Sequence, residues 1–212
     1  MKKVAVAVLA SGEGSNYRAL QAYEGAPYEI ALLGTDDPRA PALSKAREDG
    51  LPTALLPPEG FPSREAWEKA MVEVLEESRV EWVVLAGFMR ILGPFFLRAF
   101  PWRVVNLHPS LLPSFRGREA IARALQRGVS WTGITVHLVD EGVDQGPVVI
   151  QRPVPRLPGD DEESLTRRIK EAEHHLYPRA LHALLEVPFR VEEGRLLWAD
   201  ERKVRLLCGE PF

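Results

Sequence analysis

Continuous apolar runs alternate with amphipathic stretches along the first half of the chain. Val4 to Leu9 and Trp82 to Ala86 are apolar at every position, which is typical of strands buried on both faces of a parallel sheet. Ser63 can cap a helix whose apolar positions form one stripe. In this half we expect strands at 4–9, 29–34, 53–56 and 82–86, with helices at 17–23, at 41–48 and after Ser63. Such alternation predicts right-handed crossovers and a doubly wound sheet.

The second half of the chain follows a different pattern. We expect short helices at 94–100 and 119–126, strands at 104–108, 132–139 and 147–154, and a long helix at 162–186 that contains Pro178. The strands at 132–139 and 147–154 should pair directly, because no helix separates them. Residues 187–207 predict a hairpin around Glu192-Glu193-Gly194. The whole pattern predicts an α/β fold in three layers, with a mostly parallel, doubly wound (Rossmann-like) sheet and a C-terminal β-hairpin.

Composition narrows the class of protein. The chain has 212 residues, of which 45% are hydrophobic and 27% charged, as in globular proteins. A net charge of −3 argues against non-specific binding of nucleic acid. The single cysteine, Cys208, excludes an internal disulfide and a cysteine-based zinc site, and we expect a passive thiol near the end of the last strand. No apolar run approaches the length that spans a membrane, so we expect a single cytoplasmic domain over residues 1–212.

An amide and an imidazole stand together at the end of the strand expected at 104–108. Strand side chains alternate between faces, so Asn106 and His108 should point the same way. Pro109 then ends the strand, because proline cannot donate to a sheet ladder. Downstream, Asp144 opens a second proline-bounded loop, Asp144-Gln145-Gly146-Pro147.

These three polar side chains suggest acyl transfer. Asn106 and a protonated His108 can both donate to an oxygen that gains negative charge. A nearby Asp144 would favour the protonated imidazole and could take a proton from an attacking amine. No serine or cysteine is placed as an obvious nucleophile, which favours direct transfer over a covalent intermediate. The alternative is a buried histidine that an aspartate satisfies at a loop junction.

Two further loops could bind ligands. Glycines in Ser11-Gly12-Glu13-Gly14-Ser15-Asn16 would let backbone N–H groups approach an anion such as phosphate, although the spacing matches neither G-x-G-x-x-G nor a Walker loop. The alternative is a tight strand-to-helix turn without a ligand. Gly87 to Leu92 leaves a buried strand at its carboxyl end, where open α/β sheets bind ligands, but its side chains could equally cover the next helix.

The remaining histidines do not predict a metal site. His174 and His175 are adjacent in the expected long helix, and His182 is not spaced at i, i+4 from either. We therefore expect no metal. By default Glu173 is a solvated helix residue.

Six motifs match the pattern of one enzyme family. They are Ser11-Gly12-x-Gly14-Ser15-Asn16, Ser63-Arg64-Glu65, residues 85–92, residues 106–113, Asp144-x-Gly146-Pro147 and Glu173-His174. On these motifs the sequence resembles the folate-dependent formyltransferases across nearly its whole length. In the first loop and at Arg64, the sequence resembles the branch of this family that acts on a ribonucleotide.

The resemblance implies an activity and a set of roles. The implied reaction transfers the formyl group of 10-formyltetrahydrofolate, a co-substrate, to the amine of glycinamide ribonucleotide in de novo purine (IMP) synthesis. Residues 1–100 would be the nucleotide- and phosphate-binding half, and 101–212 the folate-binding and catalytic half. The implied catalytic residues are Asn106, His108 and Asp144; those for the ribonucleotide are Gly14, Ser15, Asn16, Pro109 and Glu173; those for folate are Arg64, Met89, Arg90, Ile91, Leu92, Asn106, Asp140 and Asp144.

Related activities provide the alternatives. Ser114-Phe115-Arg116-Gly117 resembles methionyl-tRNA formyltransferases, which carry an additional C-terminal domain, and formyltetrahydrofolate deformylase carries an extra N-terminal one. We expect neither from a chain of this length. A formyltransferase for another amine, and a non-catalytic binding module on the same scaffold, are further alternatives. The expected partners are small molecules, without nucleic acid or membrane, and both a monomer and a homodimer fit the sequence.

Overall fold

The structure is a computed structural model that describes residues 2–209. By its contacts the chain divides between Asn106 and Leu107 into two compact units. The ends of the expected domain, at residues 1 and 212, lie outside the described residues.

The first unit is built on parallel strands. They are β1 (Val4–Leu9), β2 (Tyr28–Thr35), β3 (Thr53–Leu55), β4 (Trp82–Leu85) and the start of β5 (Val104–His108). β1 pairs with β2 on one side and with β4 on the other, β2 pairs with β3, and β4 pairs with β5. Because both faces of the sheet are covered, Val6 to Leu9 and Val83 to Val84 are almost inaccessible to solvent, as their unbroken apolar runs predict.

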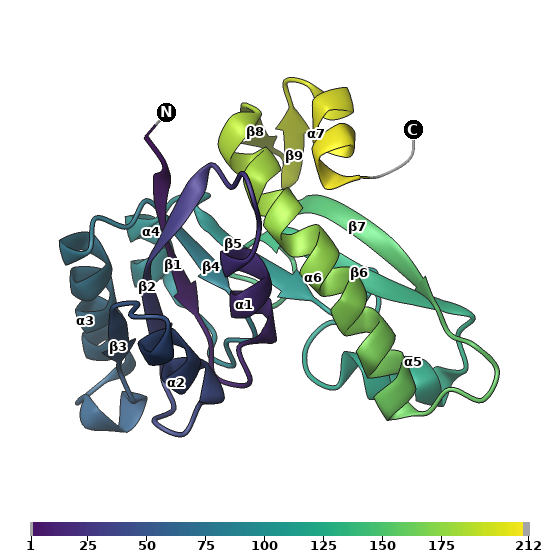
Figure 1. The fold of residues 1–212 in the computed structure, drawn as a ribbon, viewed down its shortest axis with the longest axis horizontal. Helices are drawn as coiled ribbons and strands as arrows, with labels where there is room; N and C mark the ends of the chain where they lie inside the picture. Colours follow the sequence, from purple (N-terminus) through teal and green to yellow (C-terminus); the bar gives the residue numbers. More distant parts are fainter. Residues whose placement is uncertain (1, 210–212) are drawn as a thin grey trace. The chain divides into compact units, whose positions relative to one another are not determined.

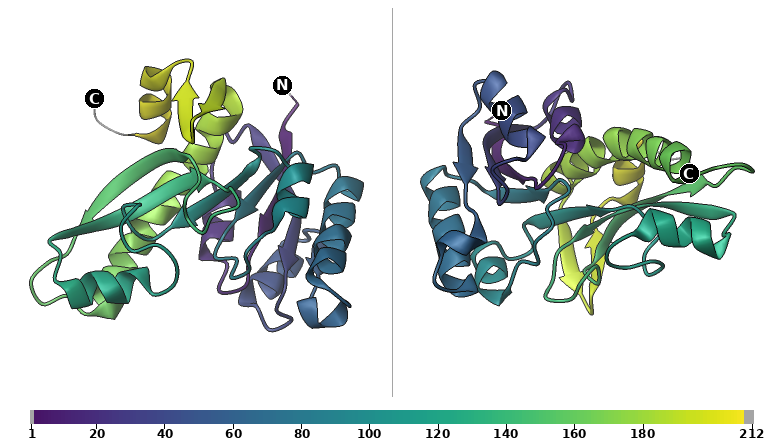
Figure 2. Two further views of the ribbon diagram at one scale, coloured as in Figure 1. Left: turned by 180° about the vertical axis from the view of Figure 1, so that it is seen from behind. Right: turned by 90° about the horizontal axis from the view of Figure 1, so that it is seen from below.

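Helices cover both faces of this sheet. They are α1 (Ser15–Gln21), α2 (Pro41–Glu48), the 3₁₀ turn η1 (Pro58–Gly60), α3 (Arg64–Glu77) and α4 (Pro94–Ala99). α1 and α2 lie on one face of the sheet and α3 and α4 on the other (Figures 1 and 2). Ser63 caps α3 as expected, since its side chain accepts a hydrogen bond from the backbone N–H of Ala66 at 3.1 Å.

The second unit contains a pair of long antiparallel strands and a long helix. β6 (Trp131–Leu138) and β7 (Val148–Pro155) pair directly, as expected from the absence of a helix between them. α6 (Glu162–Glu186) packs along this pair and continues through Pro178, while α5 (Ala120–Arg127) precedes β6 (Figure 1). Asp161 and Ser164 form a reciprocal capping box that fixes the start of α6.

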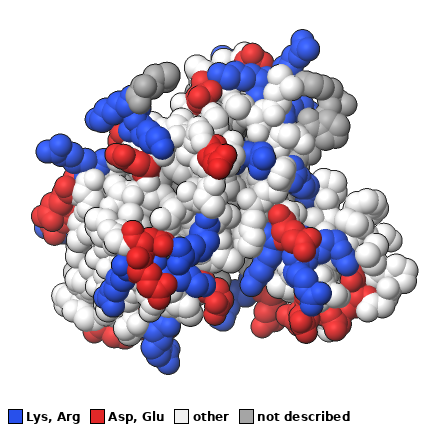
Figure 3. All heavy atoms as spheres, viewed as in Figure 1, with Lys and Arg blue, Asp and Glu red and all other residues white. Residues whose placement is uncertain are grey.

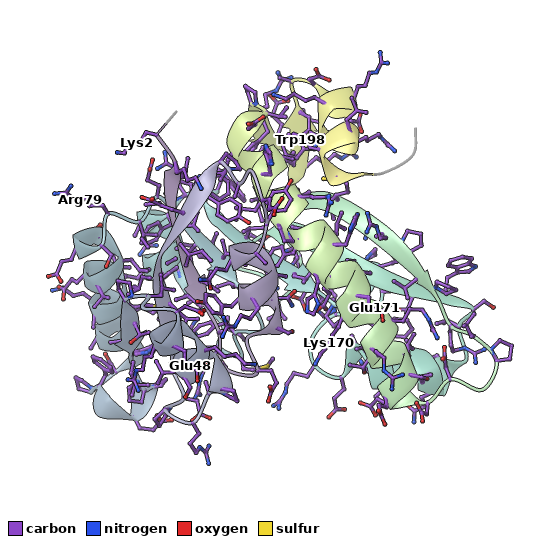
Figure 4. All side chains as sticks on the ribbon, in the orientation of Figure 1. Lys2, Glu48, Arg79, Lys170, Glu171 and Trp198 are labelled. Carbon is purple, nitrogen blue, oxygen red and sulfur yellow. The ribbon has the colours of Figure 1, made fainter. Side chains whose placement is uncertain are left out.

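The last part of the chain differs from the sequence prediction. β8 (Phe189–Glu192) and β9 (Arg195–Trp198) form the expected hairpin, in which Phe189 meets Trp198 edge to face at 5.6 Å between ring centroids. Figure 4 labels Trp198 at the end of β9. The chain then forms a helix, α7 (Glu201–Cys208), and not the end of a strand. Asp200 caps this helix, and Val204 and Cys208, which are four residues apart, form its buried face. Cys208 is therefore a buried helix residue.

The predicted fold class is confirmed. The strand order of the large sheet is β3-β2-β1-β4-β5-β6-β7. The β6–β7 pair is antiparallel, and the pairs β1–β2, β1–β4, β2–β3 and β4–β5 are parallel. Positive and negative side chains are interspersed on the face shown in Figure 3, consistent with the small net charge. Within residues 2–209, no helix is long and apolar enough to cross a membrane.

Candidate active site

The carboxyl end of β5 carries the amide and the imidazole that the sequence singles out. Asn106 is half-buried and pairs in register with Leu85 of β4. His108 follows two residues later on the same face of the strand, and its side chain is only 7% exposed. One strand, β5, thus carries both groups.

Both ring nitrogens of His108 face an oxygen atom. Nε2 donates to the backbone carbonyl of Phe115 at 2.9 Å, while Nδ1 lies 3.3 Å from Oδ2 of Asp144. A neutral imidazole has a single N–H, whereas the protonated ring can donate to both oxygens. The structure thus brings His108 and Asp144 together, as expected.

Asp144 is held in an uncommon backbone conformation. Its φ is +51°, in the left-handed region that aspartate tolerates better than most residues. Its Oδ2 also accepts a hydrogen bond from the backbone N–H of Gly117 at 2.8 Å. Two residues later, a Cβ at Gly146 would lie 1.9 Å from the carbonyl oxygen of Leu138, so this loop requires glycine there.

His137 is a site residue that sequence reasoning missed. It lies at the end of β6, is 2% exposed, and places Nε2 3.7 Å from Oδ1 of Asp144. Its Nδ1 donates to the carbonyl of Leu138 at 2.9 Å, which fixes the ring. The available signal was a histidine at the carboxyl end of a strand, just before the Asp140–Asp144 loop. The Asp144 carboxylate therefore lies between two buried imidazoles.

Burial and hydrogen bonds shift the pKa values of His108 and Asp144 in opposite directions. Burial lowers the pKa of His108 below its ordinary value, although the Phe115 carbonyl and Asp144 favour the charged ring. Burial would raise the pKa of Asp144, but His137 and the N–H of Gly117 outweigh it and lower that pKa to about 2. Asp144 is thus ionised at neutral pH. Whereas we expected a protonated His108 from the sequence, the shift favours the neutral ring.

A buried hydroxyl holds the segment that follows His108. The Oγ1 of Thr135 donates to the carbonyl of Ser110 at 2.7 Å and accepts from the N–H of Leu112 at 3.0 Å. Gln151 Nε2 donates both to Thr135 Oγ1 at 2.9 Å and to the carbonyl of Leu112 at 2.8 Å. The backbone after His108 is therefore anchored to β6 and β7.

We expect Thr135→Val to lower the free energy of unfolding by about 1–3 kcal/mol, because it leaves buried groups of Ser110, Leu112 and Gln151 without this partner. Denaturant unfolding measures the change. Thr132→Val is the matched control, since Thr132 is equally buried on the same strand and its Oγ1 has no hydrogen-bond partner. Equal losses in the two variants would contradict the anchoring role of Thr135.

The first glycine loop has a backbone conformation that favours glycine. Gly14 has a φ of +72° at the start of α1, and a Cβ there would lie 2.8 Å from Cβ of Ala42. Glu13, in the same loop, has a 70% exposed side chain whose carboxylate lies 3.7 Å from Nζ of Lys45. The Lys45 ammonium also donates to the backbone carbonyl of Glu13. The carboxylate of Glu13 thus has a cation beside it.

The segment from Gly87 to Leu92 exposes apolar side chains. Met89 is 70% exposed and Ile91 58%, whereas Leu92 is buried. Arg64 donates through Nη2 to the carbonyl of Ile91 at 2.8 Å, which joins the start of α3 to this segment. Exposed apolar side chains beside a fixed guanidinium suit a flat ligand with polar edges.

Two further predicted binding residues, Glu173 and Asp140, lie in the second unit. Glu173 is only 9% exposed, whereas Lys170 and Glu171 on the same helix are exposed (Figure 4). Glu173 is therefore not the solvated helix residue of the default interpretation. Asp140 is half-buried, and its Oδ1 accepts from the N–H of Gly142 at 3.0 Å. Over residues 2–209, no group of three or more His, Cys, Asp or Glu side chains is arranged to hold a metal ion.

Comparisons with known proteins agree on one family. The family model described as formyl transferase matches residues 3–181. The trifunctional purine biosynthetic protein adenosine-3 of Drosophila pseudoobscura pseudoobscura is 46% identical over 184 residues, which are 84% of this chain and 14% of that protein. Its counterpart in Bos taurus is 42% identical over 204 residues, 94% of this chain and 20% of that protein. The chain thus spans a fifth or less of these relatives' length.

Solved structures match over nearly their whole length. Glycinamide ribonucleotide transformylase 1 from Symbiobacterium toebii is 41% identical with a TM-score of 0.90, and the match covers 93% of this chain and 95% of that one. Glycinamide ribonucleotide transformylase 1 from Geobacillus kaustophilus is 44% identical with a TM-score of 0.84, over 87% and 100% of the two chains.

Proposed function

Because this chain belongs to the formyl transferase family, we propose that it transfers the formyl group of 10-formyltetrahydrofolate to the amine of glycinamide ribonucleotide in purine biosynthesis. The observation that carries the proposal is the pairing of buried His108 with ionised Asp144. His108 lies on β5, two residues after Asn106. The relatives' names support the choice of acceptor. The proposed partners are small molecules, and the proposed location is the cytoplasm.

The proposed chemistry is a direct attack of the amine on the formyl carbon. A carbon–nitrogen bond forms, and the formyl oxygen gains negative charge in the tetrahedral intermediate. The amide of Asn106 donates to this oxygen, and an N–H of His108 donates as well. The bond to N10 of the folate then breaks as the proton lost by the amine passes to N10, which releases tetrahydrofolate.

The partners of His108 explain how it can serve both as a proton acceptor and as a donor. Burial lowers the pKa of His108 and so favours the neutral ring, which can take up a proton as the amine becomes positively charged. Asp144 stabilises the imidazolium that results, because its carboxylate lies 3.3 Å from Nδ1. A substrate oxygen that binds Nε2–H replaces the carbonyl of Phe115, which holds that position in this structure.

We assign the other predicted residues to binding. Within the first unit, Gly14, Ser15 and Asn16 are proposed to hold the ribonucleotide phosphate, and Arg64 and Met89 to Leu92 to contact the folate. In the second unit, Pro109 and Glu173 are proposed for the ribonucleotide, and Asp140 and Asp144 for the folate, to which Asn106 also contributes. The fit of Gly14 to a left-handed turn and the exposure of Met89 and Ile91 support these roles.

A spectrophotometric assay tests the proposed function. The purified protein is mixed with 10-formyltetrahydrofolate, with and without glycinamide ribonucleotide, while the absorbance change on loss of the formyl group is followed. We expect a change that requires the ribonucleotide. Loss of the formyl group without it would indicate the deformylase instead, and folate binding without turnover would indicate another amine acceptor.

A further inference from the structure

Two buried carboxylates of the first unit have no role in the proposed chemistry. Asp36 follows β2 and is 6% exposed, and Glu68 lies on α3 and is 2% exposed. Burying a carboxylate is costly unless hydrogen bonds or opposite charges compensate it. The partners of both residues lead to the same segment, Gly87–Gly93.

Asp36 holds the first part of this segment through two donors. Its Oδ2 accepts from Nε of Arg90 at 2.6 Å, and its Oδ1 accepts from the hydroxyl of Ser11 at 2.5 Å. The same Ser11 oxygen accepts from the backbone N–H of Met89 at 2.9 Å. A second link runs from the N–H of Ser11 to the carbonyl of Gly87 at 3.2 Å. Asp36 thereby ties the Gly87–Gly93 segment to the first glycine loop.

Glu68 holds the last part of the segment. Its Oε1 accepts from the backbone N–H of Gly93 at 2.7 Å and from Nε of Arg64 at 2.9 Å. A Cβ at Gly93 would lie 2.7 Å from this Oε1, so the close approach requires glycine. Arg64 in turn donates to the carbonyl of Ile91. Between these two anchors, Phe88 stacks on Trp67 of α3 at 6.4 Å between ring centroids.

We propose that Asp36 and Glu68 are positioning residues that fix the shape of the Gly87–Gly93 segment before the folate binds. The choice of folate as the ligand rests on the proposed function, whereas the fixing of the backbone does not. Arg64 and Arg90 already donate to these carboxylates through Nε, so each guanidinium is held in place by a buried anion. A preformed segment costs less entropy to order when the ligand binds.

The two carboxylates differ in how they respond to an amide substitution. Oδ1 of Asp36 accepts from Ser11 and Oδ2 accepts from Arg90. Asp36→Asn turns one of these oxygens into an NH₂ group, which cannot accept, so one of the two hydrogen bonds is lost. In Glu68, Oε1 accepts the bonds from both Arg64 and Gly93, so Glu68→Gln can keep both. Glu68→Met has a similar length and is a good helix former, but it removes the acceptor.

Hydrogen exchange of the backbone amides tests this proposal without any substrate. We expect peptides covering residues 87–93 to exchange roughly tenfold or more faster in Asp36→Asn and Glu68→Met, the factor that corresponds to one lost hydrogen bond to a charged group. Ser11→Ala, a milder change, should accelerate exchange at Met89. Asp37→Asn is the control, since Asp37 accepts from Arg39, and it should leave this segment unchanged. Unchanged exchange in both Asp36→Asn and Glu68→Met would overturn the proposal.

Steady-state kinetics separate positioning from general destabilisation. We expect Asp36→Asn and Glu68→Met to raise the KM for 10-formyltetrahydrofolate about tenfold while kcat changes by less than about threefold, since binding and not chemistry is affected. Glu68→Gln should recover most of the wild-type KM. Equal values of KM in Glu68→Gln and Glu68→Met would overturn the acceptor role of Glu68. If the wild-type protein transfers no formyl group, the proposed function fails, and the exchange rates still decide the role of the two carboxylates.

Discussion

His108→Ala is expected to lower kcat at least ~100-fold, in line with the loss of an oxyanion donor or of a general acid and base. The ring lies at the end of β5 with both nitrogens committed, one to the Phe115 carbonyl and one to Asp144. Alanine removes both contacts and the titrating group, but leaves the backbone of the strand unchanged. Single-turnover kinetics with saturating substrates measures the chemical step directly.

The same variant should bind folate with nearly normal affinity. His175→Ala is the matched control, because His175 is an exposed histidine of α6, and its kcat should equal that of the wild type. Thermal unfolding of both variants reports any loss of stability. If His108→Ala lost folate binding and stability to the same degree as activity, His108 would be a structural residue.

Asp144→Asn is expected to lower kcat roughly 100-fold, as removal of a charged group that supports an acid–base residue typically does. Asparagine tolerates the left-handed φ of +51°, and its oxygen can still accept from the N–H of Gly117. The variant therefore removes the negative charge between His108 and His137 without a change of loop conformation. Retained activity would exclude the carboxylate from the proton transfer.

The Asp144→Asn substitution should also lower the pKa of His108 further, because the carboxylate is one of the two groups that favour the charged ring. NMR titration of the His108 ring protons in both proteins measures the shift. The direction of this pKa shift also determines how the stability contribution of His108 depends on pH. Since the folded pKa of His108 is below that of the unfolded chain, its contribution to stability is present above pH ~6.5 and is lost as the pH falls. An unchanged titration would contradict the pairing.

The pKa of Asp144 is lowered by hydrogen bonds and charges against the effect of burial, whereas burial itself lowers the pKa of His108. Both shifts make the folded protein less stable as the pH falls. The folded pKa of Asp144, about 2, is below the ordinary value of 3.8, so its stabilising effect is present above about pH 4 and is lost as the pH falls toward 2. Wild-type protein should therefore lose more stability than Asp144→Asn between these values. Urea unfolding at pH 4 and at lower pH provides the comparison.

The order of the secondary structure was determined by sequence pattern. Unbroken apolar runs predicted β1 and β4, and the bounds of α2, β5 and α6 agree with the expected ranges, because burial on two faces and helical periodicity leave distinct signatures. The hairpin at Phe189–Trp198 was also predicted. The helix after it was missed, because it is short and its start depends on the cap at Asp200.

Chemistry-bearing residue types at strand ends were also readable from the sequence. Asn106, His108 and Asp144 stood out because polar and titratable groups followed apolar strands and preceded prolines. What the sequence could not give was the environment that sets their protonation. The bond from His108 Nε2 to the Phe115 carbonyl, seven residues away, depends on how the loop after β5 folds back. The approach of Asp144 and His137 to His108, and the burial that lowers the His108 pKa, depend on segments more distant in the chain.

The buried carboxylates of Asp36 and Glu68 show most clearly what the sequence predicts and what depends on tertiary contacts. Asp36 and Glu68 belong to residue types that are exposed by default, so their one-letter codes carry no signal of burial. Their roles arise because β2, α3 and the Gly87–Gly93 segment meet in the folded first unit, where each carboxylate accepts bonds from residues 25 to 54 positions away. The sequence by itself determined which elements form, through local periodicity and turn chemistry. Tertiary structure alone decided which polar groups are buried together, since that depends on long-range packing.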